Sequence, residues 1–331
     1  MSAIINISPL GFTWQTKDPF LFCAFHEDTY PPGNSTLGLD SNLLTGRNLG
    51  QDFKSKDGFR MYHGTVVPGF PAHPHRGFET ITIVQKGLVD HSDSLGAAGR
   101  FGNGDVQWMT AGKGVQHCEM FPLLNTSKNN SLLMFQIWIN LPKAKKKCSP
   151  HFAMLWSEKI PKYIHHDDKN KKTEVTVIAG QLFEAKGLPP APDSWANNPE
   201  NGVCIWTLKM EPEAQWSLPA SGANLNRSIY YFQGKDIELE GKKVLPNHSI
   251  EIISDQTINI TNGTETSHFL LLQGKPINEP VAQFGPFVMN HQSEIQETMQ
   301  EYQSTQFGGW PWPKPDHIHA KESGRFAKYA D

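Results

Sequence analysis

Several features that would assign this sequence to a familiar class are missing from it. Only 4 cysteines occur in 331 residues, at positions 23, 118, 148 and 204, and no two of them form a CxxC pair. Cysteines that are few and scattered are typical of reduced thiols rather than of a disulfide framework. The sequence therefore predicts a cytoplasmic protein, with the nucleus as the alternative compartment if the source is eukaryotic.

Long apolar runs and an excess of positive charge are also missing. No window approaches the roughly 20 apolar residues of a membrane-spanning helix, and Lys17, Asp18 and Pro19 interrupt the region where a signal peptide would have its apolar core. Lys and Arg number 30 against 33 Asp and Glu, which gives a net charge of -3. We expect a soluble protein with no membrane association and no direct nucleic-acid partner.

Short β-branched stretches between glycines and prolines make up most of the chain. They include residues 80–84 and 132–140 in the first half and residues 175–178, 203–208, 249–254 and 269–272 in the second. Many short strands separated by turn residues are typical of a sandwich or barrel. The length predicts about two domains, so we expect an all-β protein whose halves are two similar β-domains.

The junction between these domains is expected within residues 141–163. Pro142 and Pro150 flank a run of lysines at positions 143 and 145–147, which we interpret as a solvated linker. Residues 189–192, Pro-Pro-Ala-Pro, are interpreted as a stiff loop inside the second domain.

One short helix is predicted near the C-terminus. Ser293 and Gln296 have the spacing of a capping box, and Ile295, Met299 and Tyr302 recur on one helical face. The glycines and alternating prolines of residues 307–313 favour an irregular segment that lies on the surface and buries its tryptophans. The H-x-H formed by His317 and His319 is interpreted as part of a solvated tail rather than as a second metal site.

Two short clusters carry the strongest chemical signal, His73-Pro74-His75 and His117-Cys118-Glu119. Side chains alternate along a strand, so each dyad would present two metal-type side chains on one face and Cys118 on the other. Three imidazoles and a carboxylate suit a divalent ion such as Fe(II) or Mn(II), and imidazole also suits Ni, Cu and Zn. Glu79 completes an H-x-H-x-x-x-E pattern and could face the same ion.

The text around these clusters resembles the pirin family, whose members are bicupins of the cupin superfamily. The resemblance rests on residues 73–80 (HPHRGFET), 104–112 (GDVQWMTAG) and 285–290 (GPFVMN), and extends from about Leu21 to Gln303. It implies two cupin-type β-barrels and a short C-terminal helix. The domains would be residues 1–145, which bind metal, residues 146–290, which are metal-free, and residues 291–331, which form the helix and an extended tail.

The resemblance also implies a ligand set and a cofactor. The metal ligands would be His73, His75, His117 and Glu119, and Glu79 would hydrogen-bond a ligating histidine rather than bind the metal. The cofactor would be one divalent ion, Fe(2+) in first place, with Ni, Mn, Zn, Cu and Co as alternatives. Four protein ligands would leave one or two positions open for substrate or dioxygen.

Two functions of different classes follow from the resemblance, because several pirins resemble quercetin 2,3-dioxygenases. The first is an oxidoreductase that cleaves a flavonol-like enol substrate with O2 and releases carbon monoxide, with Glu119 as the catalytic base. The second is an iron-dependent, redox-sensing regulatory protein that binds a transcription factor or a metabolic enzyme. A metal-bearing structural cupin without catalysis is the third interpretation.

Overall fold

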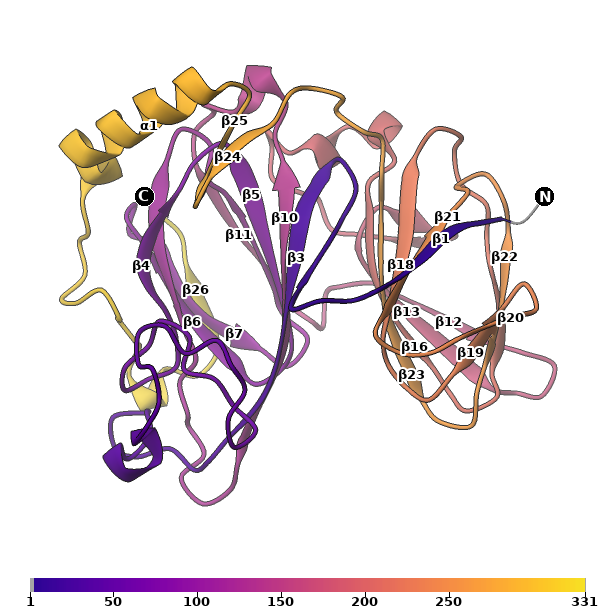
Figure 1. The fold of residues 1–331 in the computed structure, drawn as a ribbon, viewed down its shortest axis with the longest axis horizontal. Helices are drawn as coiled ribbons and strands as arrows, with labels where there is room; N and C mark the ends of the chain where they lie inside the picture. The colour runs from indigo at the N-terminus through magenta and orange to yellow at the C-terminus, as the bar shows by residue number, and fades with distance from the viewer. Residues whose placement is uncertain (1–2, 331) are drawn as a thin grey trace. The chain divides into compact units, whose positions relative to one another are not determined.

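The computed structural model describes residues 3–330 and divides the chain into two compact units. We call the unit formed by Ala24–Ser157 and the residues from Glu279 onward the first barrel. The unit formed by the residues up to Cys23 and by Glu158–Asn278 is called the second barrel. Each is built from antiparallel strands, and Figure 1 shows how the chain runs through both.

Two sheets form the first barrel. One has the order β11-β8-β5-β10-β3, and the other has the order β26-β7-β6-β9-β4. Buried apolar side chains such as Val84, Phe101 and Met134 fill part of the space between them. The strands are β3 (Phe20–Tyr30), β4 (Gly69–His75), β5 (Phe78–Lys86), β6 (Leu88–Asp93), β7 (Ala98–Gly102), β8 (Val106–Thr110), β9 (Val115–Met120), β10 (Asn130–Asn140), β11 (His151–Leu155), β24 (Ala282–Phe284), β25 (Phe287–Met289) and β26 (Phe326–Lys328).

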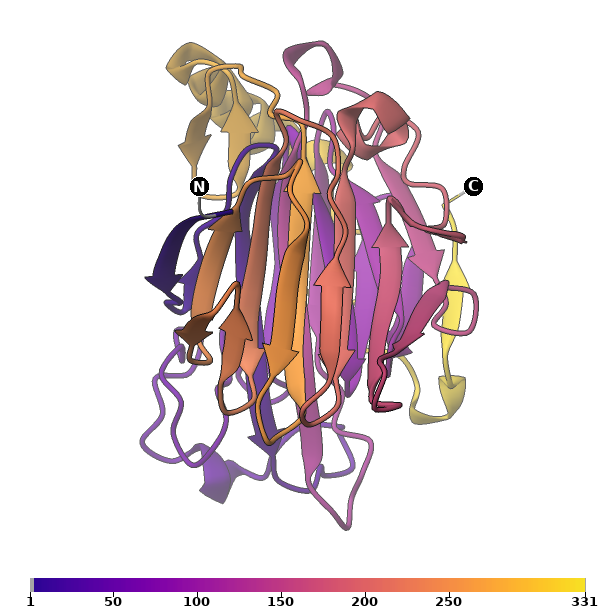
Figure 2. The same ribbon diagram turned by 90° about the vertical axis from the view of Figure 1, so that its right-hand side faces the viewer.

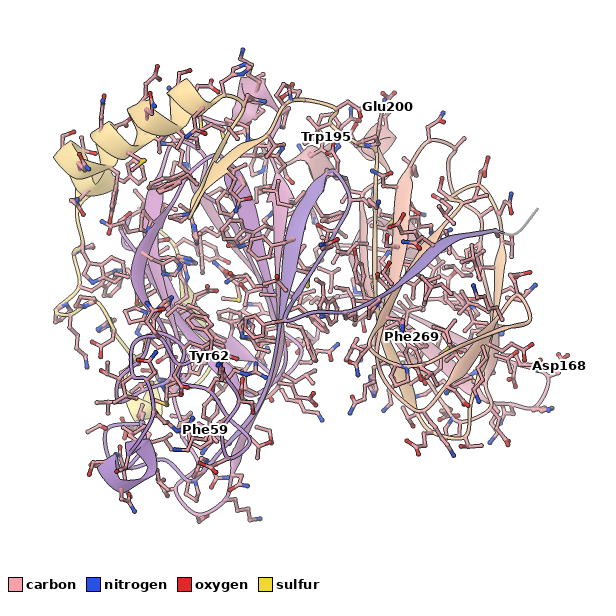
Figure 3. The ribbon with its side chains drawn as sticks, viewed as in Figure 1. Phe59, Tyr62, Asp168, Trp195, Glu200 and Phe269 are labelled. Carbon is pink, nitrogen blue, oxygen red and sulfur yellow. The ribbon has the colours of Figure 1, made fainter. Side chains whose placement is uncertain are left out.

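The second barrel also has two main sheets, with the orders β1-β21-β18-β23-β16-β13-β12 and β17-β22-β19-β20. The strands of the longer sheet run side by side in Figure 2. A large cluster of buried apolar side chains fills much of its interior, and Phe269, labelled in Figure 3, is one of them. The strands are β1 (Ile4–Pro9), β2 (Thr13–Trp14), β12 (Lys162–His166), β13 (Lys172–Ala179), β14 (Gln181–Leu182), β15 (Ala185–Lys186), β16 (Cys204–Met210), β17 (Gln215–Leu218), β18 (Asn226–Gln233), β19 (Ile237–Leu239), β20 (Lys242–Val244), β21 (His248–Ile252), β22 (Ile258–Asn262) and β23 (Ser267–Gly274).

The prediction of an all-β protein with two barrels and one short helix is confirmed. The single α-helix among residues 3–330 is α1 (Gln292–Thr305), which packs Ile295, Met299 and Tyr302 against Phe287 and its neighbours. Its cap was predicted two residues too late, because His291 rather than Ser293 is the N-cap and Glu294 closes the capping box. The Glu294 carboxylate accepts hydrogen bonds from the backbone N–H groups of Asn290 and His291.

The expected domain boundaries at residues 145 and 290 differ from the observed division. Strand β1, at the start of the chain, pairs with β21 of the second barrel, and β26, near its end, pairs with β7 of the first. Each terminal strand satisfies the open edge of a sheet whose other strands come from a distant part of the sequence. The first barrel therefore depends on residues from both sides of the second barrel's main segment.

The part of the tail around His317 and His319 was predicted to be solvated, and its packing shows otherwise. Arg100 and Asp90 form a buried ion pair, with Nε and Oδ1 2.7 Å apart, and together they bind the tail. Arg100 donates hydrogen bonds to the carbonyl oxygens of His319 and Ala320, while the His319 N–H donates to Asp90. Trp310 packs against buried residues of the first barrel, in agreement with the expectation that residues 307–313 bury their tryptophans. These contacts fix the tail on the sheet that contains β6 and β9.

The lysine run contains a second departure from expectation. Lys146 is buried in the first barrel, where its ammonium group donates hydrogen bonds to Gly77 O, Asn140 Oδ1 and Val288 O at 2.9, 2.7 and 3.2 Å. Burial lowers the pKa of Lys146 to about 8, although Glu279 and Glu294 act against this shift. The residue is therefore a structural support of the first barrel.

The described residues also contain short 3-10 turns. Two of them, η3 and η4, lie beside the pocket of the second barrel. The others are η1 (Ser41–Leu44), η2 (Lys143–Lys145), η5 (Gln306–Gly308) and η6 (Lys321–Ser323). Within residues 3–330 the structure contains no helix with both the length and the apolar character that crossing a bilayer requires.

Candidate metal centre

Strands β4 and β9 bring the three predicted histidine ligands together. The strands are antiparallel and His73 lies directly opposite His117, so these side chains and that of His75 project from the same face. One donor nitrogen of each histidine lies within 4.8 Å of the others. The three residues are buried or half-buried, and they form a group that can hold a metal ion.

Backbone carbonyls orient two of these imidazoles. Nδ1 of His73 lies 2.8 Å from Pro71 O, and Nδ1 of His75 lies 3.4 Å from Pro286 O. A ring that donates Nδ1–H to a carbonyl presents the lone pair of Nε2, which is the arrangement commonly found behind a metal-bound histidine. The carbonyls therefore select the tautomer that a metal requires.

Unpaired nitrogens supply a test of whether the residues fit a metal. Nε2 of His75 and both ring nitrogens of His117 are buried without a hydrogen-bond partner. Leaving such a group unsatisfied costs about 1–3 kcal/mol. Three convergent imidazoles, two of which have buried nitrogens without partners, match the donor set of a divalent metal site, so the residues present fit the ion.

The electrostatic state of the histidines suits the same role. Burial lowers the pKa of His73 to about 4, and burial together with the neighbouring histidines lowers the pKa values of His75 and His117 well below their usual range. Neutral imidazoles retain the lone pair that binds a metal. The site is therefore preorganised to bind a cation at neutral pH.

Glu119, predicted as the fourth ligand, lies beside the three histidines. Its Oε2 is 3.7 Å from His117 Nε2, but its carboxylate is outside the group whose donor atoms all lie within 4.8 Å of one another. Thr82 Oγ1 donates to Oε1 at 2.9 Å, and Gln136 Nε2 donates to Oε2. Burial raises the pKa of Glu119, while these two hydrogen bonds oppose the shift.

Glu79 does not continue the face that carries His73 and His75. Strand β4 ends at His75 and β5 begins at Phe78, with Gly77 between them at φ +86°. A Cβ at Gly77 would lie only 1.9 Å from Val288 O, so glycine is required at this turn. The parity argument thus fails across the turn, and Glu79 instead accepts hydrogen bonds from Trp108 and Thr110.

The sequence analysis assigned no functional role to Gln136. Gln136 on β10 lies opposite Thr82 on β5, and both residues donate to Glu119. Trp138 in turn donates to Gln136 Oε1 at 3.3 Å, which fixes the amide orientation. A lone amide in the otherwise apolar stretch 132–139 was the available signal.

His91, to which the sequence analysis assigned no role, borders the site. It lies opposite Glu119 across β6 and β9, and its ring centroid is 5.5 Å from that of His117. Its Nε2 is 3.4 Å from Asp93 Oδ2, and its ring stacks on Phe152. Only the strand pairing brings His91 to this position, so local sequence contains no signal for it.

Two family models and several known proteins match this chain. The family model described as Pirin matches residues 13–139, and the one described as Pirin C-terminal cupin domain matches residues 205–308. A pirin-like protein from Solanum lycopersicum is 34% identical over 266 residues, which cover 78% of this chain and 84% of the relative. Pirin from Homo sapiens is 32% identical over 272 residues, which cover 79% and 87%.

Two further matches concern proteins named for a reaction. A Pseudomonas aeruginosa protein that carries the name "Putative quercetin 2,3-dioxygenase" is 31% identical over 241 residues, or 72% of this chain and 79% of the relative. A crystal structure of quercetin 2,3-dioxygenase from Acinetobacter baumannii superposes with a TM-score of 0.70 at 24% identity, over 93% of this chain and 99% of that chain. The structural match supports the bicupin fold alone.

Proposed function

This chain belongs to the pirin family, and from that premise we propose that it is a metal-dependent dioxygenase of the quercetin 2,3-dioxygenase type. Its substrate would be a flavonol-like enol, and its second substrate would be O2. The observation that carries the proposal is the juxtaposition of a buried carboxylate, Glu119, with three convergent neutral imidazoles. The named relatives support the reaction class.

In this proposal His73, His75 and His117 hold one divalent metal, with Fe(2+) in first place. When bound, the ion supplies Lewis-acid and redox chemistry toward the enol and O2. Glu119 has one of two roles, as the fourth ligand or as a base beside the three histidines. The hydrogen bonds from Thr82 and Gln136 leave each carboxylate oxygen a further lone pair for either role.

The base role follows from the environment of Glu119. A carboxyl whose pKa is raised by burial accepts a proton more readily than an exposed one, provided that it is ionised when the substrate enters. It would accept the proton of the enolic hydroxyl. Gln136 acts as a positioning residue because it holds Oε2 in place, and Trp138 holds Gln136.

The test measures O2 uptake and carbon monoxide release with quercetin, on protein loaded with Fe(II) under anaerobic conditions. We expect turnover by the loaded protein and none by His73→Ala. Glu119→Gln should lower kcat by about 10²–10⁴-fold, whereas Glu322→Gln, an exposed acid of the same barrel, should not. Metal analysis of Glu119→Gln separates the two roles, because a ligand's loss lowers metal content and a base's loss does not.

Full turnover by Glu119→Gln would remove Glu119 from the base role. Absence of turnover in protein that retains its iron would contradict the dioxygenase proposal. That result would favour the regulatory alternative, in which the oxidation state of the iron changes the affinity for a protein partner.

A further inference from the structure

The second barrel has a pocket that plays no part in the proposed metal chemistry. Its volume is about 450 Å³, within the range of small-molecule sites. The pocket lies where β16 and β23 meet the loops that contain η3 (Trp195–Asn197) and η4 (Pro199–Asn201). Trp195 and Glu200, labelled in Figure 3, mark this end of the barrel. All the lining residues belong to the second barrel.

A row of polar side chains crosses three strands beside this pocket. Gln273 on β23 lies directly opposite Cys204 on β16 and Arg227 on β18. Residues paired in this way share one face of a sheet, and Cys204 belongs to the cluster that fills the barrel interior. The three side chains are buried, and Gln273 and Cys204 line the pocket.

The row contains two polar atoms without partners. Gln273 donates through Nε2 to Gly202 O at 2.9 Å and to Ser221 Oγ at 3.0 Å, which fixes the amide and leaves Oε1 without a hydrogen bond. Arg227 donates through Nη1 to Pro219 O, but its Nε has no partner. Gln273 Oε1, a buried acceptor of the pocket's lining, is thus left for a ligand, while Arg227 lies one strand away and outside that lining.

The charge around the pocket has one sign. Lys186 lines it, and no aspartate or glutamate does. Arg227 forms no ion pair with any residue in the described range, and burial lowers its pKa only to about 10, so it stays protonated at neutral pH. Glu200 lies on the neighbouring turn and is exposed outside the lining. Leu188, Pro189 and Val203 provide apolar walls.

We propose that this pocket is a second small-molecule site, which takes a small aromatic carboxylic acid that carries a hydroxyl group. The carboxylate would face the ammonium group of Lys186, with the positive charge of Arg227 one strand behind the lining, the hydroxyl would donate to Gln273 Oε1, and the ring would contact the apolar walls. The site requires no metal, and it is independent of the dioxygenase proposal.

The first experiment titrates metal-free full-length protein with 4-hydroxybenzoate by isothermal titration calorimetry. The neutral isostere 4-hydroxybenzamide is the matched probe. A charge-assisted hydrogen bond contributes about 1.5–3 kcal/mol, so we expect the acid to bind at least about tenfold more tightly than the amide. Equal affinities, or no heat with millimolar acid, would overturn the proposal.

Variants locate the binding. Lys186→Gln should weaken the acid severalfold, and Lys209→Gln, an exposed lysine of β16 outside the pocket, should leave it unchanged. Ala196→Trp, which fills the pocket from a surface turn, should abolish binding while the protein keeps its thermal unfolding profile. Binding that survives Ala196→Trp, or disappears in His73→Ala, would assign the acid to another site and overturn the proposal.

Discussion

The two barrels share an architecture and differ in what their interiors contain. The second barrel is filled by a continuous apolar cluster that includes Trp206, Leu208 and Phe269. The first places His117 and Glu119 among its buried side chains. Burying such polar groups is unfavourable unless hydrogen bonds or a metal satisfy them. The comparison indicates that the first barrel gives part of its interior to a cluster of histidines, whereas the second keeps a continuous apolar cluster and has its buried Gln273 and Arg227 beside a pocket.

Ion pairs and hydrogen bonds away from the histidine cluster also stabilise the first barrel. The buried Arg100–Asp90 pair anchors the tail, Lys146 ties three segments together, and Arg76 forms a bidentate pair with Glu301 of α1. Each of these groups joins segments distant in sequence. The first barrel, which has polar groups at its histidine cluster, is therefore stabilised by polar contacts between distant segments as well as by apolar packing.

The largest expected effect is on metal affinity, which should depend on a histidine of the first barrel and not on one of the second. His117→Ala removes one of three imidazoles, so metal affinity should fall by more than about 100-fold. His166→Ala, an exposed histidine of the second barrel, should have no effect. Metal analysis after Fe(II) loading and desalting measures both variants. If His117→Ala retained one ion per chain, the assignment of the site would be wrong.

The next effect concerns the tail anchor. Asp90→Asn keeps the shape of the side chain but leaves Arg100 buried without its counter-charge, which should lower the free energy of unfolding by about 3–5 kcal/mol. Urea denaturation measures the loss, and hydrogen exchange by mass spectrometry should assign it to peptides of the first barrel. Asp255→Asn, at an exposed position of the second barrel, is the control. Equal stability of both variants would contradict the anchoring role.

The buried Lys146 should make the free energy of unfolding of the first barrel depend on pH in the alkaline range. Burial lowers its pKa from 10.5 to about 8, so the unfolded chain binds more protons between these values and stability rises with pH across that window. The gain of wild type over Lys146→Met should grow by about 3 kcal/mol from pH 8 to 10.5. Urea denaturation across the window measures it, with the exposed Lys147→Met as the control.

The smallest effect is expected at the surface of the second barrel. Lys162 and Glu174 form an ion pair with Nζ and Oε1 2.9 Å apart, and the Lys162 side chain is 49% exposed with its partner at 22%. Solvent screens such pairs, so Lys162→Ala should lower the free energy of unfolding by less than about 1 kcal/mol. A larger loss in urea denaturation would show that the second barrel also relies on its ion pairs.

Period-two alternation was enough to predict part of the site. It placed His117 and Glu119 on one face of a strand and Cys118 on the other, where Cys118 packs with Val67 and Met120. The same rule was wrong for Glu79, because Gly77 turns the chain between β4 and β5. Alternation holds along one strand and carries no information across a turn.

The remaining parts depend on contacts between distant segments. The burial of Lys146 arises where Gly77, Asn140 and Val288 converge, and no local pattern distinguishes it from the other lysines of its run. The docking of the tail depends likewise on Asp90 and Arg100, more than 200 positions earlier in the chain. Sequence patterns predicted the strands, the helix and the histidine pair, whereas strand pairing decided these contacts.

The discontinuity of the first barrel has a consequence for biosynthesis. Strand β26 pairs with β7, yet the whole Glu158–Asn278 segment of the second barrel is translated between them. At about 5–20 residues per second, the sheet waits roughly 10–40 s for its edge strand. We expect nascent chains to expose the unpaired β7 edge during that interval.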